Sequence, residues 1–221
     1  MHVDTSAQSS KVLMMHSINA CRAANMTSSL YFSRNLLKRF FFRKNLMNVL
    51  KAVLLSKNRD TAMDFGPGFG ILLPPLSEVF EKTVALEIDD LELSYCRHIL
   101  NANAIFNVQL ILKSEENEFD DFKGEYFDCI VADNVLEHNL HAKEIIGHLF
   151  DILKKGGVLV ISLPTENLIY RLFESKKDGH VFRSNREIND LIAYARSMLS
   201  EIATFDVLPF WYTRAYLKKE K

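Results

Sequence analysis

The segment 64–70 carries the strongest chemical pattern in this chain, Asp-Phe-Gly-Pro-Gly-Phe-Gly. Gly66, Gly68 and Gly70 are three of its eight glycines, and they alternate between a short apolar run and a helix-like segment. Because glycine loses more backbone entropy on folding than other residues, such a cluster needs a geometric reason. A tight strand-to-helix turn that a ligand can approach closely supplies that reason. The spacing therefore predicts a nucleotide-type binding loop.

The carboxylate of Asp64 restricts which ligand this loop could hold. The NAD fingerprint is Gly-x-Gly-x-x-Gly, whereas this loop has one residue fewer between its last two glycines. A carboxylate that faces the loop repels a pyrophosphate, but it can accept hydrogen bonds from loop amides and attract an ammonium group. S-adenosylmethionine carries an ammonium and a sulfonium and has no phosphate. The residues thus favour it over a dinucleotide.

Five segments in this order resemble the class I S-adenosylmethionine-dependent methyltransferases. They are the acid-x-Gly-x-Gly-x-Gly loop, Val-Ala-Leu-Glu-Ile-Asp at 84–89, Lys-Ser-Glu-Glu-Asn at 113–117, Phe-Asp-Cys-Ile-Val-Ala-Asp-Asn-Val-Leu-Glu-His at 127–138 and Leu-Lys-Lys-Gly-Gly-Val-Leu-Val-Ile-Ser at 153–162. The resemblance runs from about residue 61 to the C-terminus. It implies transfer of a methyl group from S-adenosylmethionine to the O, N or C atom of a small-molecule or lipid-like acceptor.

Glu87 is predicted to bind the ribose of the cofactor. It lies about 20 residues beyond the glycines, at the predicted end of the second strand, where a carboxylate can accept hydrogen bonds from both ribose hydroxyls. Relatives usually have an acid at this place. Asp89 is the alternative, because a one-residue bulge would exchange the two, although a helix-capping role suits Asp89 or Asp90 better. Ile88 is included in the predicted cofactor site.

The resemblance implies further cofactor contacts after the third and fourth strands. Relatives often have Asp after the third strand, near the adenine amino group, and here Ser114 or Glu115 takes that place. Glu115 and Glu116 are the candidates for this contact, and a solvated acidic loop accounts for them equally well. Asp133 and Asn134 would lie near the cofactor in the loop after the fourth strand.

His138 is the predicted catalytic residue. Glu137 and His138 match the Leu-Glu-His triplet that is common in small-molecule methyltransferases of this type. An unperturbed histidine has a pKa of about 6.5, so this side chain could take a proton from the acceptor. Many relatives carry the triplet without using it as a base, and a histidine with structural hydrogen bonds at a helix start is the alternative.

The segment after the fifth predicted strand could contact the acceptor. It reads Pro-Thr-Glu-Asn with a downstream histidine, a pattern that some similar small-molecule methyltransferases carry. Polar groups at the C-terminal edge of a strand face the pocket, so Glu166, Asn167, Tyr170 and His180 are candidate acceptor contacts. A helix capped by Thr165, with Tyr170 packed against the domain, accounts for the same residues.

The alternation of strands and helices predicts the fold. Short apolar strands that alternate with helices indicate a doubly wound α/β domain with a seven-stranded, mostly parallel sheet, the Rossmann-like methyltransferase fold. Strands are expected at 61–65, 83–88, 108–112, 127–132 and 158–163, followed by a closing hairpin at 203–209 and 212–217. Helices are expected at 70–80, 91–103, 141–154 and 186–203, the third closed by Gly156-Gly157.

Two segments precede this domain, which is assigned to residues 61–221. Residues 1–27 show no clear period and are expected to form a flexible tail, and residues 28–60 are expected to form a helical extension. Its helix should run from Ser28 or Ser29 to about Ser56. Six lysines and arginines and no acid lie between residues 34 and 51, so this helix could bind a membrane surface, an anionic partner or nucleic acid, or present a solvated face.

The overall composition restricts partners and location. Apolar residues make up 48% and charged residues 25%, which is ordinary for a globular protein, and the formal net charge of -1 argues against nucleic-acid binding through a general basic field. Three widely spaced cysteines, none paired at metal-ligand spacing, predict reduced thiols, no metal site and a cytoplasmic location. The sequence has no run of about 18 apolar residues, so no transmembrane helix is expected.

Three other functions remain open from the sequence. One is a binding protein with the methyltransferase fold that lacks catalysis, which the departure at 113–117 supports. A second is an NAD-dependent oxidoreductase, which the glycine spacing and Asp64 disfavour. The third is a methyltransferase that acts on protein or nucleic acid, which the basic helix supports.

Overall fold

A seven-stranded sheet forms the centre of the molecule. The computed structural model describes residues 5–27, 30–114, 119, 121–122, 124–165, 184–208 and 210–219. The strand order is β3-β2-β1-β4-β5-β7-β6, in which β1 to β5 are parallel and β7 is antiparallel to both β5 and β6. The predicted sheet is therefore confirmed, and the closing hairpin is present, although its first strand is Ser200–Thr204 and not 203–209. The strands are β1 (Thr61–Phe65), β2 (Lys82–Glu87), β3 (Val108–Leu112), β4 (Phe127–Asp133), β5 (Leu153–Pro164), β6 (Ser200–Thr204) and β7 (Trp211–Leu217).

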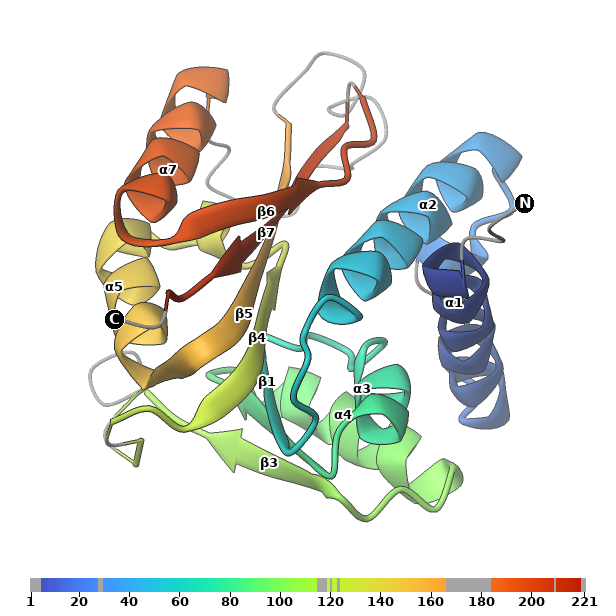
Figure 1. The fold of residues 1–221 in the computed structure, drawn as a ribbon. Helices are drawn as coiled ribbons and strands as arrows, with labels where there is room; N and C mark the ends of the chain where they lie inside the picture. Colours follow the sequence, from blue (N-terminus) through green and yellow to red (C-terminus); the bar gives the residue numbers. More distant parts are fainter. Residues whose placement is uncertain are drawn as a thin grey trace.

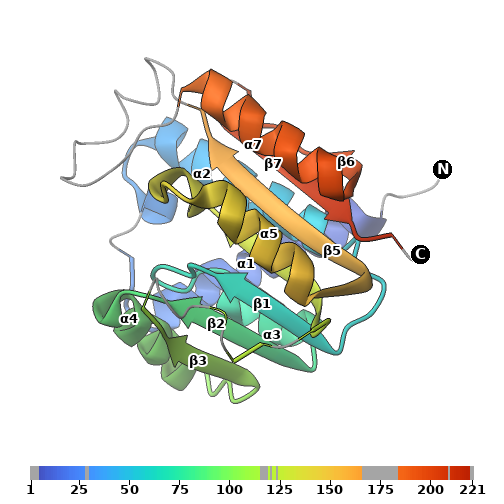
Figure 2. The ribbon, with the colours of Figure 1, turned by 90° about the vertical axis from the view of Figure 1, so that its left-hand side faces the viewer.

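Helices cover both faces of the sheet (Figure 1). Helices α5 and α7 lie on one side, in front of the sheet in Figure 2, and α1 and α2 lie behind it, with α3 and α4 on that same side. Successive side chains of a strand point to opposite faces of the sheet, so they contribute to different cores. Met63 and Phe65 pack toward α5 and α7, whereas Ala62 packs toward α1–α3. The helices are α1 (Thr5–Ala23), α2 (Leu36–Val53), α3 (Leu73–Val79), α4 (Asp90–Ala102), α5 (Ala142–Ile152) and α7 (Asn185–Met198), with short 3-10 helices η1 (Leu30–Phe32) and η3 (Leu136–His138).

The described part of the N-terminal segment packs into the core, which corrects the prediction of a flexible tail for residues 5–27 of the predicted range 1–27. Thr5–Ala23 form α1, and Leu13, Ile18 and Cys21 are buried in the same cluster as apolar residues of α2 and the sheet. The Ala20 carbonyl oxygen accepts a hydrogen bond from Asn103 Nδ2 of the α4 C-cap at 3.1 Å. Because serines and asparagines interrupt the apolar positions, the sequence pattern of this helix is weak.

The following helix begins later than predicted. Residues Leu30–Phe32 form η1, and the N-cap of α2 is Asn35, whose Oδ1 accepts hydrogen bonds from the amides of Leu37 and Lys38 at 3.0 and 3.1 Å. The predicted caps, Ser28 and Ser29, lie outside the described residues. Helix α2 shares its core with the sheet, so the predicted boundary at residue 61 lies within one continuous apolar cluster.

Three other helix boundaries also differ from prediction. Helix α3 begins at Leu73, which places its two prolines in the first turn, where a missing N–H costs least. Helix α5 ends at Ile152, and Gly156-Gly157 lie inside β5 at an irregularity in its pairing with β4, not at a helix cap. Helix α7 ends at Met198 because Ser200–Thr204 pair as β6 with β7.

Within the described ranges, no helix combines the length and the apolar character that crossing a membrane requires.

Candidate functional site

Three carboxylates meet at the edge where β1, β2 and β4 end. Asp64 is the penultimate residue of β1, Glu87 ends β2 and Asp133 ends β4. These strands are neighbours and parallel, so their C-terminal ends share one edge of the sheet. Alternation along the strands directs all three side chains toward the helices α1–α4, the side on which Ala62 and Ala85 pack. The sequence predicted each of these acids for the cofactor site, and the fold brings them together.

The glycine loop follows β1 directly and has left-handed backbone at all three glycines. The φ angles of Gly66, Gly68 and Gly70 are +69°, +53° and +84°. At Gly66 a Cβ atom would collide with Val135, and at Gly70 it would lie 3.1 Å from Cys96 Sγ. At Gly68 the nearest atom to a Cβ is 3.9 Å away, so backbone conformation and ligand approach, not crowding, require glycine there.

Glu87 is fixed against the loop by backbone amides. Its Oε2 accepts a hydrogen bond from Gly68 N at 3.2 Å, and its Oε1 accepts from Ile88 N and Asp89 N at 2.8 and 3.1 Å. Asp89 has a different role: it is the N-cap of α4, and its Oδ1 accepts from the amides of Leu91 and Glu92. The geometry therefore favours Glu87 over Asp89 as the carboxylate that faces the loop. Ile88, which follows it, is 46% exposed.

Of the three carboxylates, Asp64 is the one whose charged form its surroundings disfavour most. Its side chain is 1% exposed, and its Oδ2 has no hydrogen-bond partner among the residues that the structure describes. Burial raises the pKa of Asp64 well above its usual range, and the nearby charges of Asp133 and Glu87 raise it further. A ligand that brings positive charge and a hydrogen-bond donor would relieve both costs. These residues therefore fit the ammonium of S-adenosylmethionine.

Asp133 and Asn134 are held by an interaction that the sequence did not predict. Asp133 Oδ1 accepts hydrogen bonds from Asn134 Nδ2 at 2.8 Å and from Asn45 Nδ2 at 3.2 Å. Asn45 belongs to α2, within the segment that the sequence assigned to a helical extension. Asn134 has a left-handed backbone, with φ of +54°, and its Oδ1 accepts from Trp211 Nε1 at 2.8 Å. Helix α2 thus forms part of the site.

The network around Asn45 is buried and polar. Its Oδ1 accepts hydrogen bonds from Thr213 Oγ1 at 3.2 Å and from Ser162 Oγ at 3.3 Å. Burial raises the pKa of Asp133 to about 6, although hydrogen bonds from Ser162, Asn45 and Asn134 lower it in part. A signal was present in the sequence, because Asn45 occupies the same helix stripe as the buried residue Val49.

His138 lies at the same edge of the sheet, at the end of η3. Its side chain is 39% exposed, and its Nε2 lies 3.5 Å from Oε1 of the buried Glu137. The preceding Val135 contacts the glycine loop at Gly66. The predicted catalytic residue therefore belongs to the same short segment as a residue that contacts the loop, and the carboxylate of Glu137 lies close enough to stabilise a protonated imidazole.

Five of the predicted contacts cannot be placed. The adenine candidate Glu115 and the acceptor candidates Glu166, Asn167, Tyr170 and His180 lie outside the described residues. The alternative adenine candidate Glu116 lies outside them as well. These assignments stay predictions.

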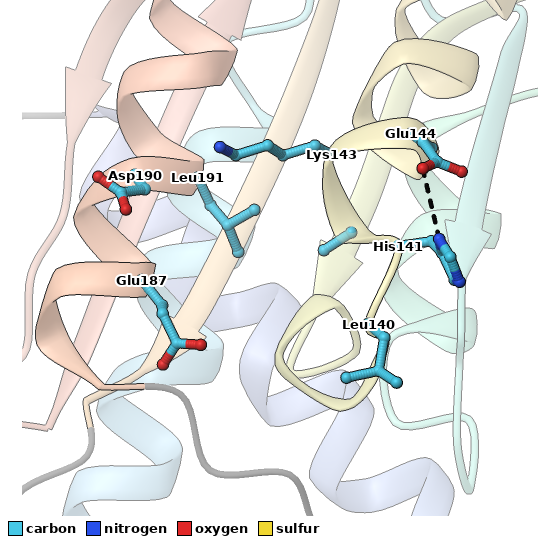
Figure 3. Close-up of a pocket in the computed structure, with 8 residues that line it drawn as sticks. Leu140, His141, Lys143, Glu144, Glu187, Asp190 and Leu191 are labelled. Carbon is cyan, nitrogen blue, oxygen red and sulfur yellow. Dashed lines mark hydrogen bonds and ion pairs between the residues drawn. The ribbon is translucent and has the colours of Figure 1, made fainter.

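A separate cavity of about 260 Å³ lies between the starts of α5 and α7 (Figure 3). In this view Lys143 extends from α5 toward α7, which carries Asp190, while His141 Nδ1 pairs with Glu144 Oε1 at 3.3 Å. Its lining comes from the helix layer opposite to the one that the three carboxylates face. It includes none of the predicted site residues and is distinct from the candidate cofactor site.

The fold and the site together define a nucleoside-binding α/β domain in which a glycine loop follows β1 and an acid ends β2. Solved structures with a similar fold include PH0226 protein from Pyrococcus horikoshii OT3, which is 17% identical with a TM-score of 0.68 and a match over 87% of this chain and 97% of that chain. N-methyltransferase NodS from Bradyrhizobium japonicum WM9 in complex with S-adenosyl-L-homocysteine is 15% identical, with a TM-score of 0.65 over 93% of this chain and 99% of that chain.

A third similar structure is an S-adenosylmethionine-dependent methyltransferase from Aquifex aeolicus, 19% identical with a TM-score of 0.60. That match covers 77% of this chain and 89% of the other. At these identities the likeness shows the fold. No curated protein matches the sequence.

The family follows from the sequence itself. The family model described as a methyltransferase domain matches residues 37–207, more than half of the chain. The chain therefore belongs to the methyltransferase-domain family. Family and fold confirm the predicted class I S-adenosylmethionine-dependent methyltransferase, an enzyme with S-adenosylmethionine as its cofactor. The matched region begins inside α2, the helix that contributes Asn45.

Proposed function

We propose that this enzyme transfers a methyl group from S-adenosylmethionine to the O, N or C atom of a small-molecule or lipid-like acceptor. The observation that carries the proposal is Asp64, a carboxylate buried beside the glycine loop with an oxygen that lacks a partner among the described residues. Such a group costs free energy unless a ligand supplies a donor. The ammonium group of S-adenosylmethionine is a donor of the required charge.

Different residues around Asp64 would bind different parts of the cofactor. The amides of the glycine loop and the Asp64 carboxylate would hold the methionine ammonium, directly or through water. Glu87 uses three of its roughly four acceptor positions for amides, which leaves Oε2 available to a ribose hydroxyl. Ile88 offers an apolar surface to the nucleoside, and Asp133 with Asn134 would line the methionine half. Glu115 remains the proposed adenine contact.

The protein's part in the reaction is alignment, exclusion of water and proton handling. When bound, the cofactor supplies an electrophilic methyl group on its sulfonium sulfur. The glycine loop, η3 and α2 would together place the acceptor atom in line with that methyl group. As the acceptor atom forms its new bond to carbon, the bond from that carbon to sulfur would break and S-adenosylhomocysteine would leave. His138 would take the proton of the acceptor atom, and the carboxylate of Glu137, 3.5 Å from His138 Nε2, would stabilise the imidazolium.

The acceptor class rests on the absence of a general basic field and on the predicted polar contacts. The near-neutral net charge of -1 favours a small molecule over nucleic acid. Glu166, Asn167, Tyr170 and His180 are the proposed acceptor contacts. A cytoplasmic location is part of the proposal and is supported by three buried free cysteines, of which Cys129 has its pKa raised to about 12 by burial.

Calorimetry with S-adenosylhomocysteine, followed by transfer of a labelled methyl group, tests the proposal. Binding is expected below about 1 mM ligand, a generous ceiling for a metabolite site, and no binding of NADH is expected. Label should then appear in a pool of small molecules or lipids. Binding without transfer to any pool would favour a protein that has lost catalysis. Transfer confined to protein or nucleic acid would overturn the acceptor class.

A substitution in the glycine loop sharpens this test. Gly68→Val should abolish detectable S-adenosylhomocysteine binding, because its φ of +53° disfavours a side chain and a Cβ there would enter the ligand's space. Gly124→Val is the matched control, since Gly124 is also left-handed, with φ of +72° and no atom within 4 Å of its Cβ position. It lies before β4, away from the site, and should strain the backbone without altering affinity. Equal loss in both variants would contradict the assignment.

A further inference from the structure

The charges of this chain are divided between two parts of the sequence. Residues 1–59 contain ten lysines and arginines and a single acid, Asp4, whereas residues 60–221 contain seventeen basic and twenty-seven acidic residues. The near-zero total therefore hides a basic N-terminal part and an acidic sheet domain. Helices α1 and α2, which carry most of this positive charge, lie side by side on one face of the molecule (Figure 1).

Four of these arginines meet at one cavity. The cavity measures about 540 Å³ and lies where the end of α1, η1 and the start of α2 come together. It is lined by the guanidinium-bearing residues Arg22, Arg34, Arg39 and Arg43 and by the hydroxyl-bearing residues Thr27 and Ser33. We call this the basic cavity. Its lining includes no acidic residue among those that the structure describes.

The arginines of the basic cavity are close to one another and have no acidic partner among the described residues. The four line one cavity, and burial lowers the pKa of Arg43, which the charges of Arg39 and Arg22 lower further. Within the described part of the chain, no carboxylate lies in ion-pair range of any of the four. Bringing like charges together costs free energy that a bound anion would recover.

Arginines of the sheet domain behave differently. Arg196 donates from Nε and Nη2 to the two carboxylate oxygens of Glu201, each at 2.9 Å. Arg214 pairs with Asp206. Carboxylates therefore neutralise Arg196 and Arg214, in contrast to the four arginines of the basic cavity.

The basic cavity is connected to the candidate cofactor site. Arg43 Nε donates to the Tyr31 carbonyl oxygen at 3.0 Å, which fixes one edge of the guanidinium and leaves its terminal nitrogens available. The Tyr31 ring lies 5.9 Å, centroid to centroid, from the ring of Phe69 in the glycine loop. Helix α2 also carries Asn45, which donates to Asp133. An anion in the basic cavity would thus contact α2, the helix that also contributes Asn45 to the candidate cofactor site.

We propose that the basic cavity binds a phosphate group carried by the methyl acceptor, an inference that rests on the proposed function. Guanidinium groups match the tetrahedral oxygens of phosphate with paired hydrogen bonds, and the hydroxyls of Thr27 and Ser33 can donate to the same oxygens. The four arginines converge on one cavity, and the neighbouring sheet domain, with its excess of acids, would repel an extended polyanion. Both features favour a small phosphorylated molecule over nucleic acid.

A soluble phosphate ester and a phospholipid head group share this chemistry. Leu36, Leu37 and Phe40, near the start of α2, are 69%, 53% and 60% exposed and would suit the apolar part of a lipid-like acceptor. The experiment therefore uses both sources. Calorimetry of the full chain measures binding of inorganic phosphate and glycerol 3-phosphate, and sedimentation measures binding to phosphatidylcholine vesicles with and without phosphatidic acid. Saturable binding to either phosphate source supports the proposal, and the tighter source identifies the acceptor type.

A pair of double variants separates the basic cavity from net charge. Arg34→Gln with Arg39→Gln should weaken phosphate binding by about ten- to hundredfold, the loss expected for charged hydrogen bonds. Lys51→Gln with Lys57→Gln removes the same charge from the same part of the chain, away from the cavity, and should change the affinity less than about twofold. The affinity for S-adenosylhomocysteine should stay unchanged in both.

The outcomes distinguish this inference from the proposed function. No binding of any phosphate probe, or equal loss in the two double variants, would overturn the phosphate site while leaving cofactor binding intact. Tighter binding of a short DNA duplex than of the small probes would replace the acceptor by nucleic acid and overturn the proposal. Failure of the wild-type protein to bind S-adenosylhomocysteine would instead overturn the proposed function.

Discussion

Two buried aspartates on neighbouring strands, Asp128 and Asp64, have opposite surroundings. Each is 1% exposed, but Asp128 lies near the start of β4 and Asp64 near the end of β1, so they occupy opposite edges of the sheet. Asp128 Oδ2 accepts hydrogen bonds from Thr61 N, Thr61 Oγ1 and Lys154 Nζ at 2.9, 3.1 and 3.0 Å. Asp64 Oδ2 has no partner among the described residues.

The difference shows that burial of a charged group does not by itself indicate function. A buried carboxylate with donors on its oxygens contributes to folding, whereas one without them makes the folded state less stable at neutral pH. In this protein the unfavourable free energy of burying Asp64 arises at the edge where the glycine loop and two further acids meet. Such a cost is expected where a ligand completes the site.

Removing the charge of Asp128 should have the largest effect on stability. Asp128→Asn loses the ion pair to Lys154, which is partly exposed, and weakens two bonds from Thr61. We expect the free energy of unfolding to fall by about 2–3 kcal/mol. Urea denaturation measures this change. The affinity for S-adenosylhomocysteine should stay the same, and a folded variant that fails to bind would contradict the separation of the two edges.

Asp64→Asn should give the opposite pair of results. The affinity for S-adenosylhomocysteine should fall by about 1.5–3 kcal/mol, the value of a charge-assisted hydrogen bond. The free energy of unfolding at pH 8 should not fall, because the substitution removes a buried charge that burial and two neighbouring acids disfavour. Calorimetry and urea denaturation on the same preparation measure the two quantities. A loss of stability like that of the Asp128 variant would show Asp64 to be structural.

Glu87 and Asp89 provide a comparison within the functional edge itself. Glu87→Ala should weaken binding of S-adenosylhomocysteine by about 1–3 kcal/mol, since its carboxylate faces Gly68 N. Asp89→Ala removes the N-cap of α4 and should cost about 1 kcal/mol of stability with an unchanged dissociation constant. The reverse pattern would move the ribose contact to Asp89.

The fold and the acids of the site could be predicted because they follow from local patterns. Strands β1 and β3 have the predicted bounds, since short apolar runs between turn residues indicate buried parallel strands. Asp64, Glu87 and Asp133 follow from their positions at strand ends, which a doubly wound sheet brings to one edge.

The contribution of the N-terminal helices could not be predicted, because it depends on contacts that are distant in sequence. Asn45 reaches Asp133 across 88 residues, and Thr213 reaches Asn45 across 168. Helix α1 is stabilised by packing against α2, α3 and α4 more than by its own weak period. Local sequence patterns carry neither kind of information.

The affinity for the cofactor and the stability of the free protein should also depend on pH, with opposite signs. Below the raised pKa of Asp64, the free protein holds a proton that the bound ammonium group should displace. The affinity for S-adenosylhomocysteine should therefore increase with pH, by at most about tenfold per pH unit for one released proton. Calorimetry between pH 5 and 8 in buffers of different ionisation enthalpy measures both the affinity and the proton.

Stability of the free protein should change in the other direction. A carboxyl whose pKa is raised by folding binds more protons in the native state than in the unfolded state, so its contribution to the free energy of unfolding falls as pH rises through that range. Asp64→Asn should reduce both slopes. A residual slope near pH 6 should remain, because burial also raises the pKa of Asp133 to about 6. Slopes identical to those of the wild type would show that Asp64 does not titrate with ligand binding.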